Sequence, residues 1–406
     1  MDKRRLIGII LFIAITVLFG LALYFVFFAK KDVRQPTPGQ QPTGTTGRFP
    51  STGEGNTVRT TTPSRTTFPA ARTSTTGGVG ETTVVTPKVT QVLRDPITNP
   101  AKDSGSTAKF YSQNDGRFYR VDQNGKVTPL SDQVFFNVQK VTWAPKNNES
   151  ILEYPDGSNI YYNFETKKQV TLPKHWEEFS FSPTGDKIAA KSMGLSPENR
   201  WLVVSNPEGS ETTLVEPMGN NADKVTVDWS GNKQIIALSR TGEALGSDRQ
   251  EVLFVGLNGE NFKSTIVEGR DLRTQWSTNG TKLLYSVYSS RSDFKPELWV
   301  VNGDTDALGT GRKYLNLNTW ADKCTFGTDR YVYCGVPESL EAGSGFAPGL
   351  ANTTPDTIVK IDVETGARTE IRTDGDYVID RLFVGEDGRT LFFTDKSKPG
   401  LFRTSL

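Results

Sequence analysis

Short runs of apolar and β-branched residues, separated by turn residues, recur along most of the chain. The segment Arg273–Asp304 is the clearest copy, with runs at Thr274–Ser277, Leu283–Val287 and Leu298–Val301 and a turn at Gly280. Short aromatic and β-branched runs closed by turn dipeptides predict β-strands in hairpins. A hairpin of three strands cannot bury its faces alone, so this unit predicts a stack of similar units.

The same pattern fills the second three-quarters of the chain. Each copy begins with a short run that ends in a turn, and two further apolar runs follow it. The first runs lie about 40 to 58 residues apart, and four strands in a repeat of this length are typical of β-propeller blades. The first runs are Val141–Pro145, Phe179–Pro183, Thr226–Ser230, Thr274–Ser277, Cys324–Gly327 and Leu382–Gly385.

Two segments before the first of these copies complete the ring. Residues 97–132 contain three runs typical of strands, and we expect them to form one more blade. The last copy has only three runs before Leu406. The run 87–93 would supply the missing outer strand, close the ring and remove exposed sheet edges. The sequence therefore predicts an all-β, seven-bladed β-propeller over residues 87–406. Six blades are the alternative, if 97–132 pack differently.

An apolar run precedes the repeats. Leu6–Phe28 holds 23 residues without a charge, and Lys3–Arg5 and Lys30–Lys31 flank it. As a helix it would be about 35 Å long, enough to cross a bilayer core of about 30 Å. The run is longer than the apolar core of a cleaved signal peptide, and no A-x-A cleavage site follows it. We therefore expect residues 1–34 to form a short tail and a retained transmembrane anchor, with cleavage as the alternative.

A segment rich in Thr, Pro, Gly and Ser separates this anchor from the repeats. Residues 35–86 show no apolar periodicity. Such a composition cannot offset its ordering entropy by burial, so it predicts a disordered linker. The short basic tail before the anchor favours a cytoplasmic N-terminus. The propeller is then expected outside the cytoplasm, held at the cell membrane by a single span.

Composition limits the chemistry that the chain can perform. The net charge is +1, and no basic block is long enough to indicate nucleic acid as a partner. His175 is the single histidine, although His supplies most general bases and many metal ligands near neutral pH. We therefore expect no catalytic residue, no metal site and no cofactor. A carboxylate-based glycan hydrolase or lyase, acting in the propeller funnel, is the alternative.

Two cysteines fall in one predicted hairpin. Cys324 lies on the first strand of the sixth blade and Cys334 on the second, so their side chains face each other across the hairpin. That separation suits a disulfide, which agrees with an oxidising location outside the cytoplasm. Two buried free thiols are the alternative.

Two of the repeats carry a motif of a known family. Trp276–Tyr285 (WSTNGTKLLY) and Phe181–Ala189 (FSPTGDKIA) resemble the W-S-P-D-G signature of TolB-like propellers. Similar units form the propellers of the dipeptidyl peptidase IV and prolyl oligopeptidase families. The resemblance covers residues 87–406 and implies the propeller fold. No G-x-S-x-G nucleophile motif of the peptidases occurs. The predicted anchor distinguishes the chain from soluble TolB, which binds partner proteins, and the arrangement resembles membrane-anchored envelope proteins.

The longest connections between the predicted strands indicate a binding face. Four of them, 192–200, 240–250, 288–297 and 337–356, join the second and third strands of their blades and so open on the same side of the ring. Function on such scaffolds concentrates in elaborated loops, and aromatic residues and Arg dominate binding hot spots. The candidate binding residues are Trp176, Tyr288, Arg291, Phe294, Trp320 and Phe346.

The function expected from these features is non-catalytic. We expect a membrane-anchored propeller that acts as a binding or scaffold module of the cell envelope. Its expected partner is an envelope protein or a cell-wall glycan.

Overall fold

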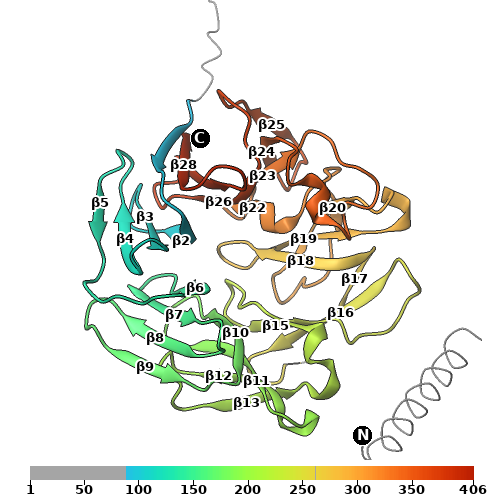
Figure 1. Cartoon of the computed structure of the whole chain (residues 1–406). Helices are drawn as coiled ribbons and strands as arrows, with labels where there is room; N and C mark the ends of the chain where they lie inside the picture. The colour runs from blue at the N-terminus through green and yellow to red at the C-terminus, as the bar shows by residue number, and fades with distance from the viewer. Residues whose placement is uncertain (1–87, 261) are drawn as a thin grey trace, which may run out of the picture. The chain divides into compact units, whose positions relative to one another are not determined.

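The computed structural model describes residues 88–260 and 262–406, which fold into β-strands and short 3-10 helices (Figure 1). The strands form seven sheets of four antiparallel strands each. The prediction of an all-β, seven-bladed propeller is confirmed, and the six-bladed alternative is wrong. Within this part of the chain, no helix is long and apolar enough to cross a membrane. The predicted anchor (1–34) and linker (35–86) lie outside the described residues.

The first three blades each contain four strands that follow one another in the sequence, from the central channel outward. Blade 1 consists of β2 (Ile97–Lys102), β3 (Ala108–Ser112), β4 (Arg117–Val121) and β5 (Val127–Pro129). Blade 2 consists of β6 (Lys140–Trp143), β7 (Glu149–Glu153), β8 (Asn159–Asn163) and β9 (Gln169–Leu172). Blade 3 consists of β10 (Trp176–Phe181), β11 (Ile188–Met193), β12 (Arg200–Ser205) and β13 (Thr213–Pro217).

Blades 4 to 6 repeat this order. Blade 4 consists of β14 (Val225–Val227), β15 (Ile235–Ser239), β16 (Gln250–Gly256) and β17 (Thr265–Val267). Blade 5 consists of β18 (Arg270–Trp276), β19 (Lys282–Tyr288), β20 (Pro296–Asn302) and β21 (Lys313–Tyr314). Blade 6 consists of β22 (Cys324–Phe326), β23 (Tyr331–Pro337), β24 (Asp356–Asp362) and β25 (Arg368–Ile371).

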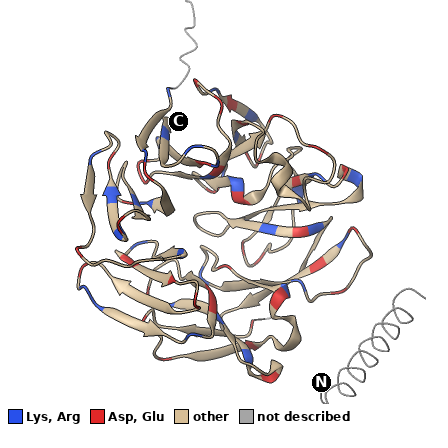
Figure 2. Ribbon diagram, in the orientation of Figure 1, with Lys and Arg blue, Asp and Glu red and all other residues tan. Residues whose placement is uncertain are grey.

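Blade 7 takes its outer strand from the other end of the described chain. It consists of β26 (Ile379–Val384), β27 (Thr390–Asp395), β28 (Leu401–Ser405) and β1 (Thr90–Leu93). Short 3-10 helices lie in the connections: η1 (Pro197–Asn199), η2 (Gly219–Lys224), η3 (Ser290–Ser292), η4 (Ala321–Lys323) and η5 (Pro348–Ala351). Basic and acidic residues are intermingled over the ring in the view of Figure 2.

The hydrophobic cores lie between neighbouring blades. Every residue of the second strands β3 and β15 is buried, whereas every residue of the outer strand β5 is exposed. In one core, Leu284 and Leu298 of blade 5 pack with Val332 and Ile361 of blade 6. Because both faces of a second strand are covered, its apolar residues form a continuous run rather than an alternating one.

The ring closes where β1 pairs antiparallel with β28. Leu93 of β1 is buried in one core with Leu401 of β28. At Gly400, directly before β28, φ is +100°, and a Cβ atom there would lie 2.0 Å from the carbonyl oxygen of Leu93. Glycine is therefore required at this position, both for its backbone conformation and for the close approach of β1.

We predict that Gly400→Ala weakens this closure. The added methyl group meets the backbone of Leu93, so the substitution should lower the free energy of unfolding by more than about 2 kcal/mol. Gly388→Ala, in the same blade, is the matched control, because φ there is +64° and a Cβ would have no neighbour within 4 Å. Its cost should be about 1 kcal/mol. Chemical denaturation checks both variants, and equal losses would contradict the importance of the approach.

A disulfide joins the two inner strands of blade 6. Cys324 of β22 lies directly opposite Cys334 of β23, with their Cα atoms 4.0 Å apart, and the two sulfur atoms are bonded. Both residues are buried. The bond attaches β22, which has only three residues, to the longer strand beside it.

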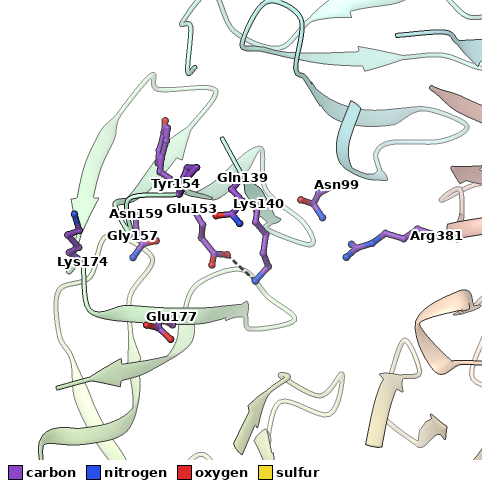
Figure 3. Close-up of a pocket in the computed structure, with 11 residues that line it drawn as sticks. Asn99, Gln139, Lys140, Glu153, Tyr154, Gly157, Asn159, Lys174, Glu177 and Arg381 are labelled. Carbon is purple, nitrogen blue, oxygen red and sulfur yellow. Dashed lines mark ion pairs between the residues drawn. The ribbon is translucent and has the colours of Figure 1, made fainter. Parts of the chain in front are cut away.

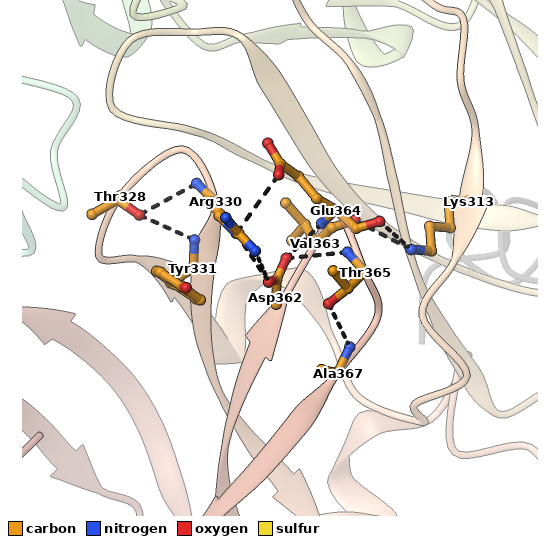
Figure 4. A network of polar contacts seen from close by, with 9 residues as sticks. All are labelled: Lys313, Thr328, Arg330, Tyr331, Asp362, Val363, Glu364, Thr365 and Ala367. Atoms are coloured by element: carbon orange, nitrogen blue, oxygen red, sulfur yellow. Dashed lines mark hydrogen bonds and ion pairs between the residues drawn. The ribbon is translucent and has the colours of Figure 1, made fainter.

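The turns of blade 6 at the opposite end are fixed by one carboxylate (Figure 4). Asp362 accepts two hydrogen bonds from the Arg330 guanidinium, at 2.9 and 2.7 Å, and two from the N–H groups of Glu364 and Thr365. These donors, Arg330 above all, hold the pKa of Asp362 well below its usual range. Lys313 of blade 5 donates to the carbonyl oxygen of Glu364 at 2.9 Å and links the two blades.

Candidate binding face

The connections on one side of the ring are longer than the turns between first and second strands on the other. This side carries the connections between second and third strands and those between successive blades, and we call it the loop face. Its longest connection, 338–355, joins β23 to β24, and 240–249 joins β15 to β16. In contrast, the turn 144–148 between β6 and β7 is short. The loop face therefore offers the more variable surface for recognition.

Three predicted binding residues meet on the loop face. Tyr288 ends β19, Phe294 follows η3 and Phe346 lies in the connection before η5. Their ring centroids are 5.9 to 6.4 Å apart and the rings are T-shaped to one another. Phe294 is 41% exposed and Phe346 61% exposed. We call these three residues the aromatic cluster, which presents apolar surface to solvent across blades 5 and 6.

The backbone holds the aromatic cluster in place. The N–H of Gly343 donates to the carbonyl oxygen of Asp293 at 2.8 Å, and the N–H of Gly345 donates to that of Phe294 at 2.7 Å. A Cβ at Gly345 would lie 2.5 Å from the Cβ of Tyr288, so only glycine fits beside that ring. Asp293 and Phe294 both adopt left-handed conformations, with φ of 53° and 56°. Consecutive strained residues of this kind concentrate at functional sites.

Arg291, another predicted binding residue, lies in η3 between Tyr288 and Phe294 in the sequence. Its guanidinium is 3.1 Å from the carboxylate of Glu268, which also pairs with Arg312 at 3.1 Å and Arg249 at 3.4 Å. Arg291 is itself exposed. It therefore lies in the same loop as Tyr288 and Phe294, pairs with Glu268, and leaves part of its surface open to a partner.

Trp176 and Trp320 are buried rather than on the surface. Trp176 begins β10 and packs in the core between blades 2 and 3. Trp320 lies beside Lys323, whose ammonium group is 6.0 Å from the ring centroid. That ammonium pairs with both oxygens of Asp356 at 2.7 Å, and the same carboxylate accepts the N–H of Ile379. Burial lowers the pKa of Lys323 and raises that of Asp356. Trp176 thus serves packing between blades, and Trp320 is enclosed beside the Lys323–Asp356 pair.

A polar cavity at the mouth of the channel was missed by sequence reasoning. It has a volume of about 550 Å³ and lies among blades 7, 1, 2 and 3 (Figure 3). We call it the channel-mouth cavity. Within it, the ammonium of Lys140 pairs with the carboxylate of Glu153 at 3.1 Å. The residues that line it include Asn99, Gln139, Lys140, Glu153, Glu177 and Arg381.

Irregular strands supply three of these lining residues. The pairing of β2 with β3 breaks register between Thr98 and Ala101, around Asn99. The pairing of β10 breaks after Glu177, and that of β26 breaks before Arg381. Bulges redirect side chains and occur next to active sites more often than elsewhere. These bulges could not be predicted from the sequence, because no residue type marks a bulge in these strands.

Asp228 is a separate titratable group between the inner strands of blades 4 and 5. The hydroxyl of Thr274 donates to its carboxylate at 3.2 Å. Burial raises the pKa of Asp228 to about 7, because desolvation disfavours the charged form. Within residues 88–260 and 262–406, no three His, Cys, Asp or Glu side chains are placed to hold a metal ion.

We predict that Asp228→Asn stabilises the protein at pH 8.5 but not at pH 3.5. The folded-state pKa is raised, so the stabilisation from the protonated carboxyl is complete below about pH 4 and is lost as pH rises through about 7. The amide never ionises, so the variant avoids this loss, which is at most about 4 kcal/mol. Thermal unfolding at the two pH values measures it. Asp306→Asn, an exposed carboxylate, controls for net charge, and an equal effect of Asp228→Asn at both pH values would refute the prediction.

Comparison with known proteins shows a likeness of fold only. No family model matches the chain, and no curated protein does. The tricorn protease aligns with a TM-score of 0.50 and 12% identity, over 77% of this chain and 33% of its own, so this chain spans about a third of its length. An oligogalacturonate lyase in complex with manganese aligns with a TM-score of 0.51 and 14% identity, over 78% of this chain and 93% of its own.

A third structure has the same fold. The β-propeller domain of Cps50 (Swd1) from Myceliophteria thermophila aligns with a TM-score of 0.51 and 10% identity, over 78% of this chain and 99% of its own. At such identities a shared fold carries no shared activity. The described chain is thus a seven-bladed β-propeller with an elaborated loop face, and its function has to be inferred from its own residues.

Proposed function

We propose that the protein is a non-catalytic binding module of the cell envelope. In this proposal the apolar run Leu6–Phe28 anchors it in the membrane, and the linker 35–86 holds the propeller outside the cytoplasm. The loop face binds an envelope protein or a cell-wall glycan. A TolB-like role in protein binding is in keeping with the repeat motif at Trp276–Tyr285.

The aromatic cluster is the observation that carries this proposal. Two of its rings are substantially exposed, although burying them would gain roughly 25 cal/mol for each Å² of apolar surface. The hydrogen bonds of Gly343 and Gly345 keep the two loops together before any partner arrives. A surface ordered in advance loses less conformational entropy on binding. Aromatic residues and arginine are enriched in binding hot spots, and Arg291 lies in the same loop as Phe294.

The enzymatic alternative has weaker support. Glu153 and Glu177 both line the channel-mouth cavity, which a carboxylate-based glycan hydrolase or lyase would require. However, Glu153 forms an ion pair with Lys140 at 3.1 Å. The solved structures of similar fold include a protease and a lyase but also the Cps50 propeller, so they favour no activity.

We predict that the double variant Phe294→Ala, Phe346→Ala loses the partner. Removing both rings should weaken binding roughly tenfold or more, because truncation of a hot-spot side chain costs about 2 kcal/mol or more. Cross-linking in native membranes, followed by quantitative mass spectrometry, measures the partner retained. Leu214→Ala, an exposed apolar side chain on the outer strand of blade 3, is the matched control. Undiminished cross-linking by the double variant would rule out the aromatic cluster.

We also predict that residues 1–34 determine membrane attachment. The full chain should remain in the membrane pellet after an alkaline carbonate wash, because an apolar run of 23 residues is long enough to span the bilayer. A chain that begins at Gln35 should be released by the same wash. Protease added outside intact cells should digest the propeller. A full chain found in the wash, or a propeller protected until lysis, would contradict the proposed topology.

A further inference from the structure

The channel-mouth cavity is part of a longer groove. Two further cavities, of about 420 and 450 Å³, share lining residues with it. The second cavity, at blades 7 and 1, shares Asn99, Gln139 and Arg381 with the channel-mouth cavity. The third cavity, between blades 1 and 2, shares Gln139 and Pro155 with it. We call the three together the channel-mouth groove. It is elongated across four blades, so it suits a chain-like ligand rather than a compact one.

The charges of the channel-mouth groove nearly cancel. Asp395 is already engaged, since its carboxylate accepts the N–H groups of Val378 and Ser397. The other charged lining residues are the cations Lys140, Lys174 and Arg381 and the carboxylates Glu153, Glu177 and Asp380. A groove with three cations and three carboxylates has no excess charge with which to attract an anionic polymer. An uncharged ligand fits this balance better.

Several side chains in the groove are left without a partner. Among the described residues, Gln139, Glu177 and Arg381 make no side-chain hydrogen bond or ion pair, and Glu177 and Arg381 are exposed. Glutamine both donates and accepts, arginine only donates and a carboxylate only accepts. A hydroxyl group can meet any of the three, because it donates and accepts at once. Neighbouring hydroxyls of a sugar ring present several such groups on a rigid frame.

A peptide fits this lining less well. Peptide grooves add main-chain pairing with a strand to pockets for apolar side chains. The channel-mouth groove instead combines amides, carboxylates and cations, and most of its lining surface is polar. The volume of the central cavity, about 550 Å³, falls within the range of about 300 to 1,000 Å³ that is usual for small-ligand sites.

We propose that the channel-mouth groove binds an uncharged glycan chain. Arg381 and Gln139 donate hydrogen bonds to its hydroxyl or acetamido oxygens, and Glu177 accepts from its hydroxyl groups. Glu177 and Arg381 line the channel-mouth cavity, and each lies next to a break in strand register. The inference rests on the proposed function only in taking the loop face as the binding surface, and it assigns that surface a second contact area.

Titration calorimetry with the intact, detergent-solubilised protein tests this assignment. The probes are cellotetraose and chitotetraose, two uncharged sources of the same chemistry, an alginate tetrasaccharide as the acidic glycan, and the peptide Gly-Ser-Gly-Ser. We expect at least one uncharged tetrasaccharide to bind, and whichever of the two binds more tightly identifies the sugar type. Arg381→Ala and Gln139→Ala should each weaken that binding about tenfold. Neither side chain bonds to another described residue, so both variants should fold.

Controls separate this proposal from the aromatic cluster. Arg389→Ala removes an exposed arginine from the turn at the other end of β26 and should leave glycan affinity unchanged. The double variant at Phe294 and Phe346 should also keep it, so that failure of one contact area does not imply failure of the other. The proposal is overturned if neither uncharged tetrasaccharide binds, if alginate or the peptide binds more tightly, or if Arg381→Ala binds like the wild type.

Discussion

Ring closure between β1 and β28 is the constraint on which the rest of the structure depends. Each blade covers one face of the next, so an open ring would expose two apolar sheet faces. The closing strand helps to cover them, because Leu93 enters the core between blades 7 and 1 and Val89 enters that between blades 6 and 7. Closure requires glycine at position 400, because a Cβ atom there would lie too close to the carbonyl oxygen of Leu93.

Closure leaves the two sides of the ring free to differ. On the side opposite the loop face, short turns are held by carboxylates such as Asp362, which bonds to Arg330 and to backbone N–H groups. On the loop face, long connections are hydrogen-bonded to one another; for example, the N–H of Gly345 donates to the carbonyl oxygen of Phe294. The ring fixes the positions of the strands, and the proposed binding surface lies on the loops that they carry. A buried pair, Lys323 with Asp356, fixes blade 6 to blade 7 beneath these loops.

Much of the fold could be predicted from the sequence, because a propeller repeats one pattern. The apolar runs of the second strands, such as Leu283–Val287, appear once per blade and give the count directly. Burial of individual loop residues could not be predicted in this way. Trp320 and Phe346 are both aromatic residues in long connections, yet one packs over Lys323 and the other is exposed. Only the path of the backbone distinguishes them.

The channel-mouth groove was beyond sequence reasoning for a related reason. Asn99, Glu177 and Arg381 come from blades 1, 3 and 7 and meet only because the ring is closed. Their convergence also depends on register breaks, which arise from local twist and not from a motif. The position of a single short loop can be predicted from the sequence. A site formed by the inner strands of several blades can be found only in the closed structure.

The position of the closing strand also bears on how the loop face could meet a partner. The N–H of Val89, just before β1, donates to the carboxylate of Asp374 in the connection between β25 and β26, so the start of β1 is attached to the chain that joins blades 6 and 7. The aromatic cluster on blades 5 and 6 and the groove across blades 7 to 3 share that face. Under the proposed function, a linker of the length of residues 35–86 would hold the propeller about 40 Å from the membrane. If both proposed contact areas bind the same partner, they would act together, since binding at the first raises the effective concentration at the second.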